Sequence, residues 1–276
     1  MSWFRILSAG ALMAALALSS CKKPDEAPVE HAPPVIETAP PVATGGASPM
    51  NFAQKTDAAE VTLKLPRAIA AQPDLHARLY ADGVRDLKAF AEGAANERAE
   101  LAGEDGPSQP YERTITWTVG ADTSKLLSLS SLQSEYTGGA HGNAAFGSVL
   151  WDKALKRTIS PTGLFGANVD AAMDKALCDA LIAEKKARLA ETYTPPGQDW
   201  NCPKWRDTPF ELAASTMAGK AGGLRFLIGP YVAGSYAEGT YEPVVPFSAF
   251  SRYLKPAYAD EFAGSPRPTP AAAAQP

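Results

Sequence analysis

The sequence predicts an α+β fold in which two main helices pack on antiparallel sheet. The order of the expected elements (strand, helix, strands, helix, strands) is the first observation that supports this class. The second is the alternation of apolar and polar residues over 111–119, which is typical of an antiparallel strand with one buried face. The third is the composition, because 45 % hydrophobic and 20 % charged residues are ordinary for a globular protein.

The first half of the fold begins with a strand at residues 60–66, where apolar and polar residues alternate. Pro73 suits the first turn of a helix, which Gly103 ends. We expect His76 on the surface of the first turn of this helix. The apolar face of the helix is formed by Leu75, Leu79, Val84, Leu87, Phe90 and Ala94. Strands at 111–119, 126–136 and 144–152 follow.

The strand at 126–136 changes phase along its length. Leu127 and Leu129 share one phase, whereas Leu132 has the opposite one. A β-bulge near Ser130-Ser131 would explain this slip and would re-aim the residues that follow.

The second half begins with another helix, which we expect Asn168 to cap and which ends near Ala190. A loop at 194–205 follows, and then segments 210–216, 224–228 and 241–247. A short helix at 248–254 completes the fold.

The N-terminus predicts a signal peptide at residues 1–20. Arg5 precedes an apolar run, residues 6–18, that is too short to span a bilayer. The run ends in Leu18-Ser19-Ser20-Cys21, which resembles the lipobox of bacterial lipoproteins and implies lipidation of Cys21. An ordinary cleaved signal with a chance cysteine is the alternative.

The lipobox resemblance also implies a cellular address. Lys22, rather than an aspartate, follows the cysteine, so we expect a lipid-anchored protein of the cell envelope, on the outer membrane and facing the periplasm. Acyl chains supply the anchor, so no transmembrane helix is required. Residues 21–54 are rich in proline and predict an extended linker, and residues 263–276 predict a disordered tail. In an oxidising periplasm, Cys178 and Cys202 are expected to form a disulfide rather than to bind a metal.

The region between the two ends is long enough for one large domain or for two small ones that share a core. We divide it into residues 55–160 and residues 161–262 and leave both possibilities open. The formal net charge is −4, and no basic run is longer than two lysines. Nucleic acid is therefore not an expected partner.

Unusual features are concentrated at residues 135–143. Gly138 and Gly139 admit backbone angles that are closed to other residues. Tyr136 precedes these glycines and His141 follows them. The segment could be a shaped loop that presents Tyr136 and His141 to a ligand. The alternative is a glycine hinge between two strands.

Two segments resemble known families. The run Tyr136-Thr137-Gly138-Gly139-Ala140-His141-Gly142-Asn143 resembles the signature of the small domain that precedes the catalytic region in PdaC-type peptidoglycan deacetylases. The run from Pro230-Tyr231 through Tyr236-Ala237-Glu238-Gly239 is similar to the RsiV-like C-terminal domain family. That domain family, whose function is unknown, includes the extracytoplasmic part of lysozyme-sensing anti-sigma factors.

These resemblances imply a binding module rather than an enzyme. The deacetylase active site belongs to a different domain, and the sequence lacks its metal-ligand pattern, so no cofactor is expected. The module would bind peptidoglycan fragments or a muramidase such as lysozyme. The candidate binding residues are Tyr136, Gly138, Gly139, His141, Tyr231, Tyr236 and, as a contact for a cationic partner, Glu238.

Two other functions are compatible with the sequence. One is a structural envelope protein without a small ligand. The other is a hydrolase built on His141, which would need an orienting carboxylate and a nucleophile. Candidates for these two roles are Glu135, Asp152 or Glu238 and Ser134 or Ser235, respectively.

Overall fold

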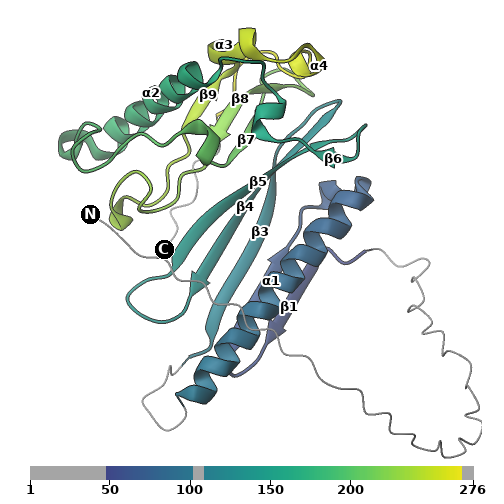
Figure 1. Ribbon diagram of the computed structural model, residues 1–276, viewed down its shortest axis with the longest axis vertical. Helices are drawn as coiled ribbons and strands as arrows, with labels where there is room; N and C mark the ends of the chain where they lie inside the picture. Colours follow the sequence, from purple (N-terminus) through teal and green to yellow (C-terminus); the bar gives the residue numbers. More distant parts are fainter. Residues whose placement is uncertain (1–47, 102–108, 269–276) are drawn as a thin grey trace, which may run out of the picture. The chain divides into compact units, whose positions relative to one another are not determined.

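The computed structural model describes residues 48–101 and 109–268 (Figure 1). The predicted signal peptide, Cys21 and most of the predicted linker lie outside the described residues, as does the tail from residue 269. Within the described part, the strands form a six-stranded sheet and a three-stranded sheet. None of the described helices is long and apolar enough to cross a membrane.

The first sheet has the strand order β1-β2-β3-β4-β5-β6. Its neighbouring strands are antiparallel except for β2 and β3, which are parallel. Helix α1 (Pro73–Glu100) connects these two strands and lies along the sheet in Figure 1. The strands are β1 (Asn51–Lys55), β2 (Ala59–Lys64), β3 (Tyr111–Asp122), β4 (Leu126–Tyr136), β5 (Asn143–Asp152) and β6 (Arg157–Thr158). The α+β class is confirmed, with a mixed sheet where a purely antiparallel one was expected.

Helix α1 buries its apolar face on one face of this sheet. This core contains Leu75, Leu79, Leu87, Ala91 and Ala94 of the helix and Val61, Leu63, Ile115, Leu127 and Leu129 of the strands. His76 is buried at its edge, where Nε2 lies 2.9 Å from the carbonyl oxygen of Pro49. The expectation of a surface histidine was wrong because the chain before β1 covers the start of the helix.

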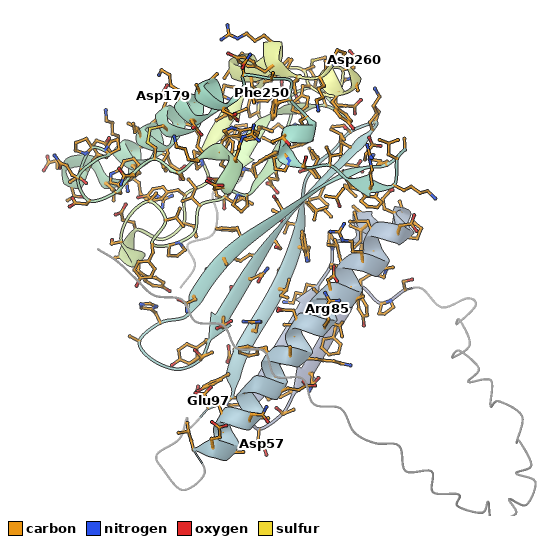
Figure 2. The ribbon with its side chains drawn as sticks, viewed as in Figure 1. Asp57, Arg85, Glu97, Asp179, Phe250 and Asp260 are labelled. Atoms are coloured by element: carbon orange, nitrogen blue, oxygen red, sulfur yellow. A yellow bond between two sulfur atoms is a disulfide. The ribbon has the colours of Figure 1, made fainter. Side chains whose placement is uncertain are left out.

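The second sheet consists of β7 (Phe210–Ala214), β8 (Ala221–Phe226) and β9 (Val244–Pro246). Helix α2 (Asp170–Leu189) and the short helices α3 (Phe247–Phe250) and α4 (Pro256–Ala259) are near it in Figure 1. Phe250, labelled in Figure 2, packs edge-on against Phe165 and Phe262 in the core of this half. The two main helices expected from the sequence are therefore α1 and α2.

Strand β4 is buried on both of its faces where β7 packs against it. Leu127 and Leu129 belong to the core under α1, whereas Leu126 belongs to the core of the second sheet. On that second face, the Oγ atom of Ser128 accepts a 2.8 Å hydrogen bond from the backbone N–H of Leu212. Burial of both faces produces the change of phase seen in the sequence, so the bulge expected at Ser130-Ser131 was wrong. The register shift lies in the partner strand β3, between Val119 and Ala121.

Both predicted boundaries of the folded region were wrong by a few residues. Strand β1 begins at Asn51, inside the stretch predicted as the 21–54 linker, and pairs with β2 through its backbone. At the other end, the predicted tail 263–276 is ordered to residue 268. The backbone N–H of Arg267 donates to the carbonyl oxygen of Ala214 at 2.8 Å, and Thr216 donates to that of Ser265 at 2.8 Å. Backbone pairing of this kind leaves no apolar pattern in the sequence.

The disulfide between Cys178 and Cys202 is confirmed and ties helix α2 to the loop that follows it. Trp200 and Trp205 of this loop are buried in the second core. Asn168 has a φ of 67° and Val169 occupies the N-cap of α2, so the predicted cap was wrong by one residue. All described residues belong to one compact unit. The division at residue 160 remains a prediction.

Candidate binding cleft

A cleft of about 890 Å³ lies where the free face of the first sheet meets the second sheet and the chain before β9. Side chains at alternate positions of β3 and β4 point to the same face of the sheet, so Thr116 and Thr118 line the cleft together with Ser130 and Leu132. The other lining residues are Ala144, Phe146, Arg188, Glu211, Arg225, Leu227, Pro230, Tyr236, Ala237, Glu238, Gly239, Thr240 and Glu242. The lining is rich in hydroxyl and charged groups.

A polar network is buried in the cleft around Glu211 of β7. Its Oε1 accepts a 2.6 Å hydrogen bond from Nη1 of Arg225, and its Oε2 accepts one of 2.7 Å from the hydroxyl of Ser130. The hydroxyl of Ser130 also lies 3.0 Å from that of Thr118. Burial raises the pKa of Glu211, the charge of Glu242 raises it further, and the hydrogen bonds from Ser130 and Arg225 only partly offset this. The network connects the two sheets through side chains.

Gly120 allows β7 to approach the first sheet this closely. A Cβ atom at this position would lie 2.7 Å from Cδ of Glu211 and 2.7 Å from the carbonyl oxygen of Leu212. The glycine is the residue at which the register of β3 shifts. A side chain at the bulge would therefore push β7 and the network around Glu211 away from the floor of the cleft.

An aromatic cluster at the cleft consists of His141, Tyr231 and Tyr236. His141 stacks on Tyr236, with ring centroids 3.7 Å apart and planes inclined by 15°. The ring of Tyr231 lies 5.5 Å from that of Tyr236, and its Oη is 3.4 Å from Nε2 of His141. Because Tyr236 also lines the cleft, this cluster continues the cleft surface. The sequence named all three residues, and the fold brings them together.

The loop that carries His141 depends on its glycines. Gly138 and Gly139 have φ angles of 93° and 90°, which L side chains rarely adopt. The hydroxyl of Tyr136 donates a 3.0 Å hydrogen bond to the carbonyl oxygen of Gly139 and so closes this loop on itself. The hydroxyl of Tyr236 donates to the carbonyl oxygen of Gly142 at 2.9 Å and joins the loop to the second half of the chain. Tyr136 thus shapes the loop, whereas Tyr236 docks it.

Glu238 anchors the segment that carries the two tyrosines. Its Oε2 accepts hydrogen bonds from Nζ of Lys185 at 2.6 Å and from the hydroxyl of Tyr241 at 2.5 Å. Its Oε1 accepts one from the backbone N–H of Ser235 at 3.0 Å, which completes a capping box. Burial acts to raise the pKa of Glu238, but the bonds from Lys185, Tyr241 and Ser235 together hold the pKa below its ordinary value. The carboxylate is therefore engaged within the chain, in addition to lining the cleft.

Lys185, the cationic partner of Glu238, was not predicted from the sequence. Its side chain is only 1 % exposed, and its ammonium lies 4.4 Å from the ring centroid of Trp200 and 4.9 Å from that of Tyr241. A lysine in a helix is ordinarily assigned to the solvent face. The available signal was its spacing, because it follows Leu181 by four residues on the buried stripe that begins with Met173 and Leu177.

Tyr231 combines strain with exposure. Its φ is 67°, in the left-handed region that is unfavourable for a bulky residue. The residue is 64 % exposed, and the adjacent Val232 is 55 % exposed. Strained residues persist where the surrounding structure fixes them, and they are enriched at binding sites.

The carboxylates proposed for a hydrolase do not hydrogen-bond to His141. Its ring nitrogens lie near the carbonyl oxygen of Gly142 and the hydroxyl of Tyr231. The three candidate carboxylates bond elsewhere: Glu135 to Arg113, Asp152 to Tyr258 and Glu238 to Lys185. Within the described residues, no group of three or more histidine, cysteine, aspartate or glutamate side chains could hold a metal ion.

Residues 52–144 match the family described as "Deacetylase PdaC". Two solved structures are similar to the chain. A DUF3298 family member from Bacteroides fragilis has 18 % identity and a TM-score of 0.51, and covers 74 % of this chain and 88 % of its own. A DUF3298 family protein from Pseudomonas aeruginosa has 18 % identity and a TM-score of 0.50, and covers 79 % of this chain and 99 % of its own. No curated protein matches the sequence.

The fold is therefore that of the α+β proteins grouped as DUF3298. More particularly, residues 52–144 form a PdaC-like domain that contains α1, most of the first sheet and the glycine–histidine loop. The PdaC-like resemblance read from the sequence is confirmed. The matched region ends at residue 144, before the second sheet and the tyrosines of the aromatic cluster.

Proposed function

We propose that this chain is a non-catalytic binding protein of the bacterial cell envelope whose cleft holds a segment of peptidoglycan glycan. The observation that carries the proposal is the position of Tyr236, which lines the cleft and at the same time stacks on His141. A ligand in the cleft would contact aromatic surface and hydroxyl groups together.

This combination suits the chemistry of a sugar chain. Pyranose rings present an apolar face of C–H groups that packs on aromatic rings, and their hydroxyl groups need hydrogen-bond partners. Thr116 and Thr240 supply hydroxyl groups in the cleft, and Tyr236 supplies ring surface. A volume of about 890 Å³ falls within the range of small-ligand sites. Several partners fixed by the fold would orient one ligand.

The cellular address belongs to the same proposal. A lipid on Cys21 would hold the protein at the outer membrane, facing the periplasm, and a linker from residue 22 would let the folded part reach the cell wall. The PdaC-like match over residues 52–144 agrees with an envelope function. We also keep the RsiV-like resemblance of residues 161–262 as part of this proposal.

Calorimetric titration of the chain without residues 1–21 tests the proposal. Peptidoglycan fragments and oligomers of N-acetylglucosamine are titrated into the wild type and into Tyr236→Ala. Saturable binding that Tyr236→Ala weakens by about tenfold or more is the expected result, since a stacking ring contributes on the order of 1 kcal/mol beyond its buried area. Glu191→Gln, which changes an exposed residue outside the cleft, is the control. If no glycan binds, a structural envelope protein without a small ligand is the better account.

A muramidase such as lysozyme is the second candidate partner. The exposed Tyr231 and Val232 favour it, because exposed aromatic residues with a rigid backbone are common anchors of protein interfaces. Titration with lysozyme separates the two candidates. Loss of lysozyme binding in Val232→Ser with glycan binding unchanged would assign the exposed pair to a protein partner.

A further inference from the structure

Glu242 is the carboxylate of the cleft that has no hydrogen-bond partner among the described residues. Its side chain is 35 % exposed, and the nearest cationic atom is Nε of Arg225 at 4.0 Å, beyond hydrogen-bond distance. The other two carboxylates of the lining differ from it, because Glu211 and Glu238 each accept several hydrogen bonds.

Most donors of the cationic groups near Glu242 are committed to other partners. Arg225 donates through Nη1 to Glu211, whereas its buried Nε has no hydrogen-bond partner among the described residues and lies 4.0 Å from Oε2 of Glu242. Arg188 donates through Nη1 to the carbonyl oxygens of Glu238 and Thr240, and through Nη2 to Glu184. Lys185 donates to Glu238. Moving Arg188 or Lys185 to neutralise Glu242 would leave another carboxylate or carbonyl oxygen unpaired, which is unfavourable. Arg225 divides its single charge between Glu211 and Glu242, so it balances only one of these two carboxylates.

The negative charge of Glu242 also affects the pKa values of neighbouring carboxyl groups. Burial raises the pKa of Glu184 and of Glu211, and the negative charge of Glu242 contributes to both shifts in the same direction. This part of the cleft thus has an excess of carboxylate. A ligand group with positive charge and several N–H donors would balance it, since a carboxylate accepts charge-assisted hydrogen bonds from an ammonium.

We infer that Glu242 selects a ligand that carries an ammonium group, as found on an amino sugar without its acetyl group or on the diamino acid of a stem peptide. This inference rests on the proposed glycan-binding function and adds a specificity-determining residue to it. A neutral N-acetyl group offers a single N–H donor and no charge, so it would gain less from Glu242. An anionic ligand group would be repelled there.

Three probes distinguish the sources of the ammonium group: a tetramer of N-acetylglucosamine, the matching tetramer of glucosamine, and a free stem peptide that contains a diamino acid. Each is titrated into the chain without residues 1–21, at low and at high salt. The variant is Glu242→Gln, which keeps the size of the side chain and removes its charge. Glu191→Gln, which removes an exposed carboxylate outside the cleft, is the matched control.

The expected result is that the glucosamine tetramer, the peptide or both bind at least about tenfold more tightly than the acetylated tetramer, and that Glu242→Gln abolishes this preference while Glu191→Gln keeps it. The preference should also shrink at high salt. If the wild type binds both tetramers equally and Glu242→Gln changes nothing, the inference is wrong and the glycan-binding function stands. If Glu242→Gln weakens the binding of both tetramers to the same extent, Glu242 accepts hydrogen bonds from sugar hydroxyl groups in general, and the inference is likewise wrong. If the wild type binds none of the probes, the proposed function itself fails.

Discussion

The imidazole ring of His141 lies 3.7 Å from the phenol ring of Tyr236 and nearly parallel to it. His141 follows β4 of the first sheet, whereas Tyr236 precedes β9 of the second sheet. The contact therefore forms only when the two sheets are packed together. The hydroxyl of Tyr236 adds a hydrogen bond to the carbonyl oxygen of Gly142 across the same junction. The candidate site is thus a product of the tertiary fold.

Replacing Tyr236 by phenylalanine should weaken this junction while keeping the stack. We expect Tyr236→Phe to lower the free energy of unfolding by about 0.5–1.5 kcal/mol, because the hydrogen bond from this hydroxyl to the carbonyl oxygen of Gly142 is lost. Chemical denaturation measures the effect. Tyr136→Phe removes a hydroxyl that bonds to Gly139 within its own loop and serves as the comparison. Amide exchange in residues 229–239 should accelerate in Tyr236→Phe and not in Tyr136→Phe. Equal exchange in both variants would argue against the junction.

Replacing Lys185 should lower the free energy of unfolding much more than Tyr236→Phe does. Lys185→Met leaves the carboxylate of Glu238 without its cationic partner, and breaking a buried pair from one side costs about 3 kcal/mol or more. Lys186→Met is the matched control, because Lys186 is adjacent on α2 and exposed. We expect that control to stay within about 0.5 kcal/mol of the wild type. Comparable losses in the two variants would mean that the ion pair does not hold the segment.

The stability of the protein should depend on pH with opposite signs at two glutamates. The pKa of Glu238 lies below the ordinary value of 4.5, so its stabilising contribution is present above pH 4.5 and is lost as the pH falls through the folded-state pKa. The pKa of Glu211 lies above 4.5, so its contribution is present below pH 4.5 and is lost as the pH rises through the folded-state pKa.

Urea denaturation of the wild type, Glu238→Gln and Glu211→Gln over a range of pH checks this prediction. The advantage of the wild type over Glu238→Gln should shrink on acidification. The difference between the wild type and Glu211→Gln should move the opposite way and favour the wild type on acidification. If the two stability differences changed with pH in the same direction, the environments assigned to Glu238 and Glu211 would be contradicted.

Most of the elements and part of the site could be predicted because they follow from local patterns. Helical spacing located α1 and α2, and alternation located β3. The pair Gly138-Gly139 marked the loop because positive φ angles require glycine. The tyrosines at 231 and 236 were identified by resemblance. None of these inferences needed knowledge of which segments are neighbours in space.

The remaining features depend on contacts between distant segments. Lys185 is buried only because Glu238 and Trp200 come from later parts of the chain. Glu211 and Arg225 look like exposed strand residues until β7 packs on β4. The same packing buries both faces of β4, which made its pattern resemble a bulge. Long-range burial of polar groups has no periodicity, so the polar part of the cleft was missed.

The disulfide should stabilise the loop that supplies Trp200. Cys178 and Cys202 are separated by 24 residues, and closing a loop of that length stabilises a fold by about 3 kcal/mol on the chain-entropy model. We expect the double variant Cys178→Ser/Cys202→Ser to lose about this much in chemical denaturation. Adding reductant to the wild type should reproduce the loss and should have no further effect on the variant. An unchanged midpoint in both experiments would show that the loop is held by its packing alone.

Strand β7 approaches β3 closely at Gly120, so this position should not tolerate a side chain. A methyl group there would overlap Glu211 and the backbone of Leu212, so Gly120→Ala should cost about 1–3 kcal/mol through displaced backbone. Gly93→Ala is the matched control because it lies within α1 and a Cβ there meets nothing within 4 Å. The control should gain about 0.5–1 kcal/mol, since alanine is the better helix former. The displacement in Gly120→Ala would also move Glu211, so glycan binding should weaken in this variant and remain intact in Gly93→Ala. Gly120→Ala with normal stability and normal binding would show that β7 can retreat without disturbing the cleft, and would exclude a role for the bulge in shaping it.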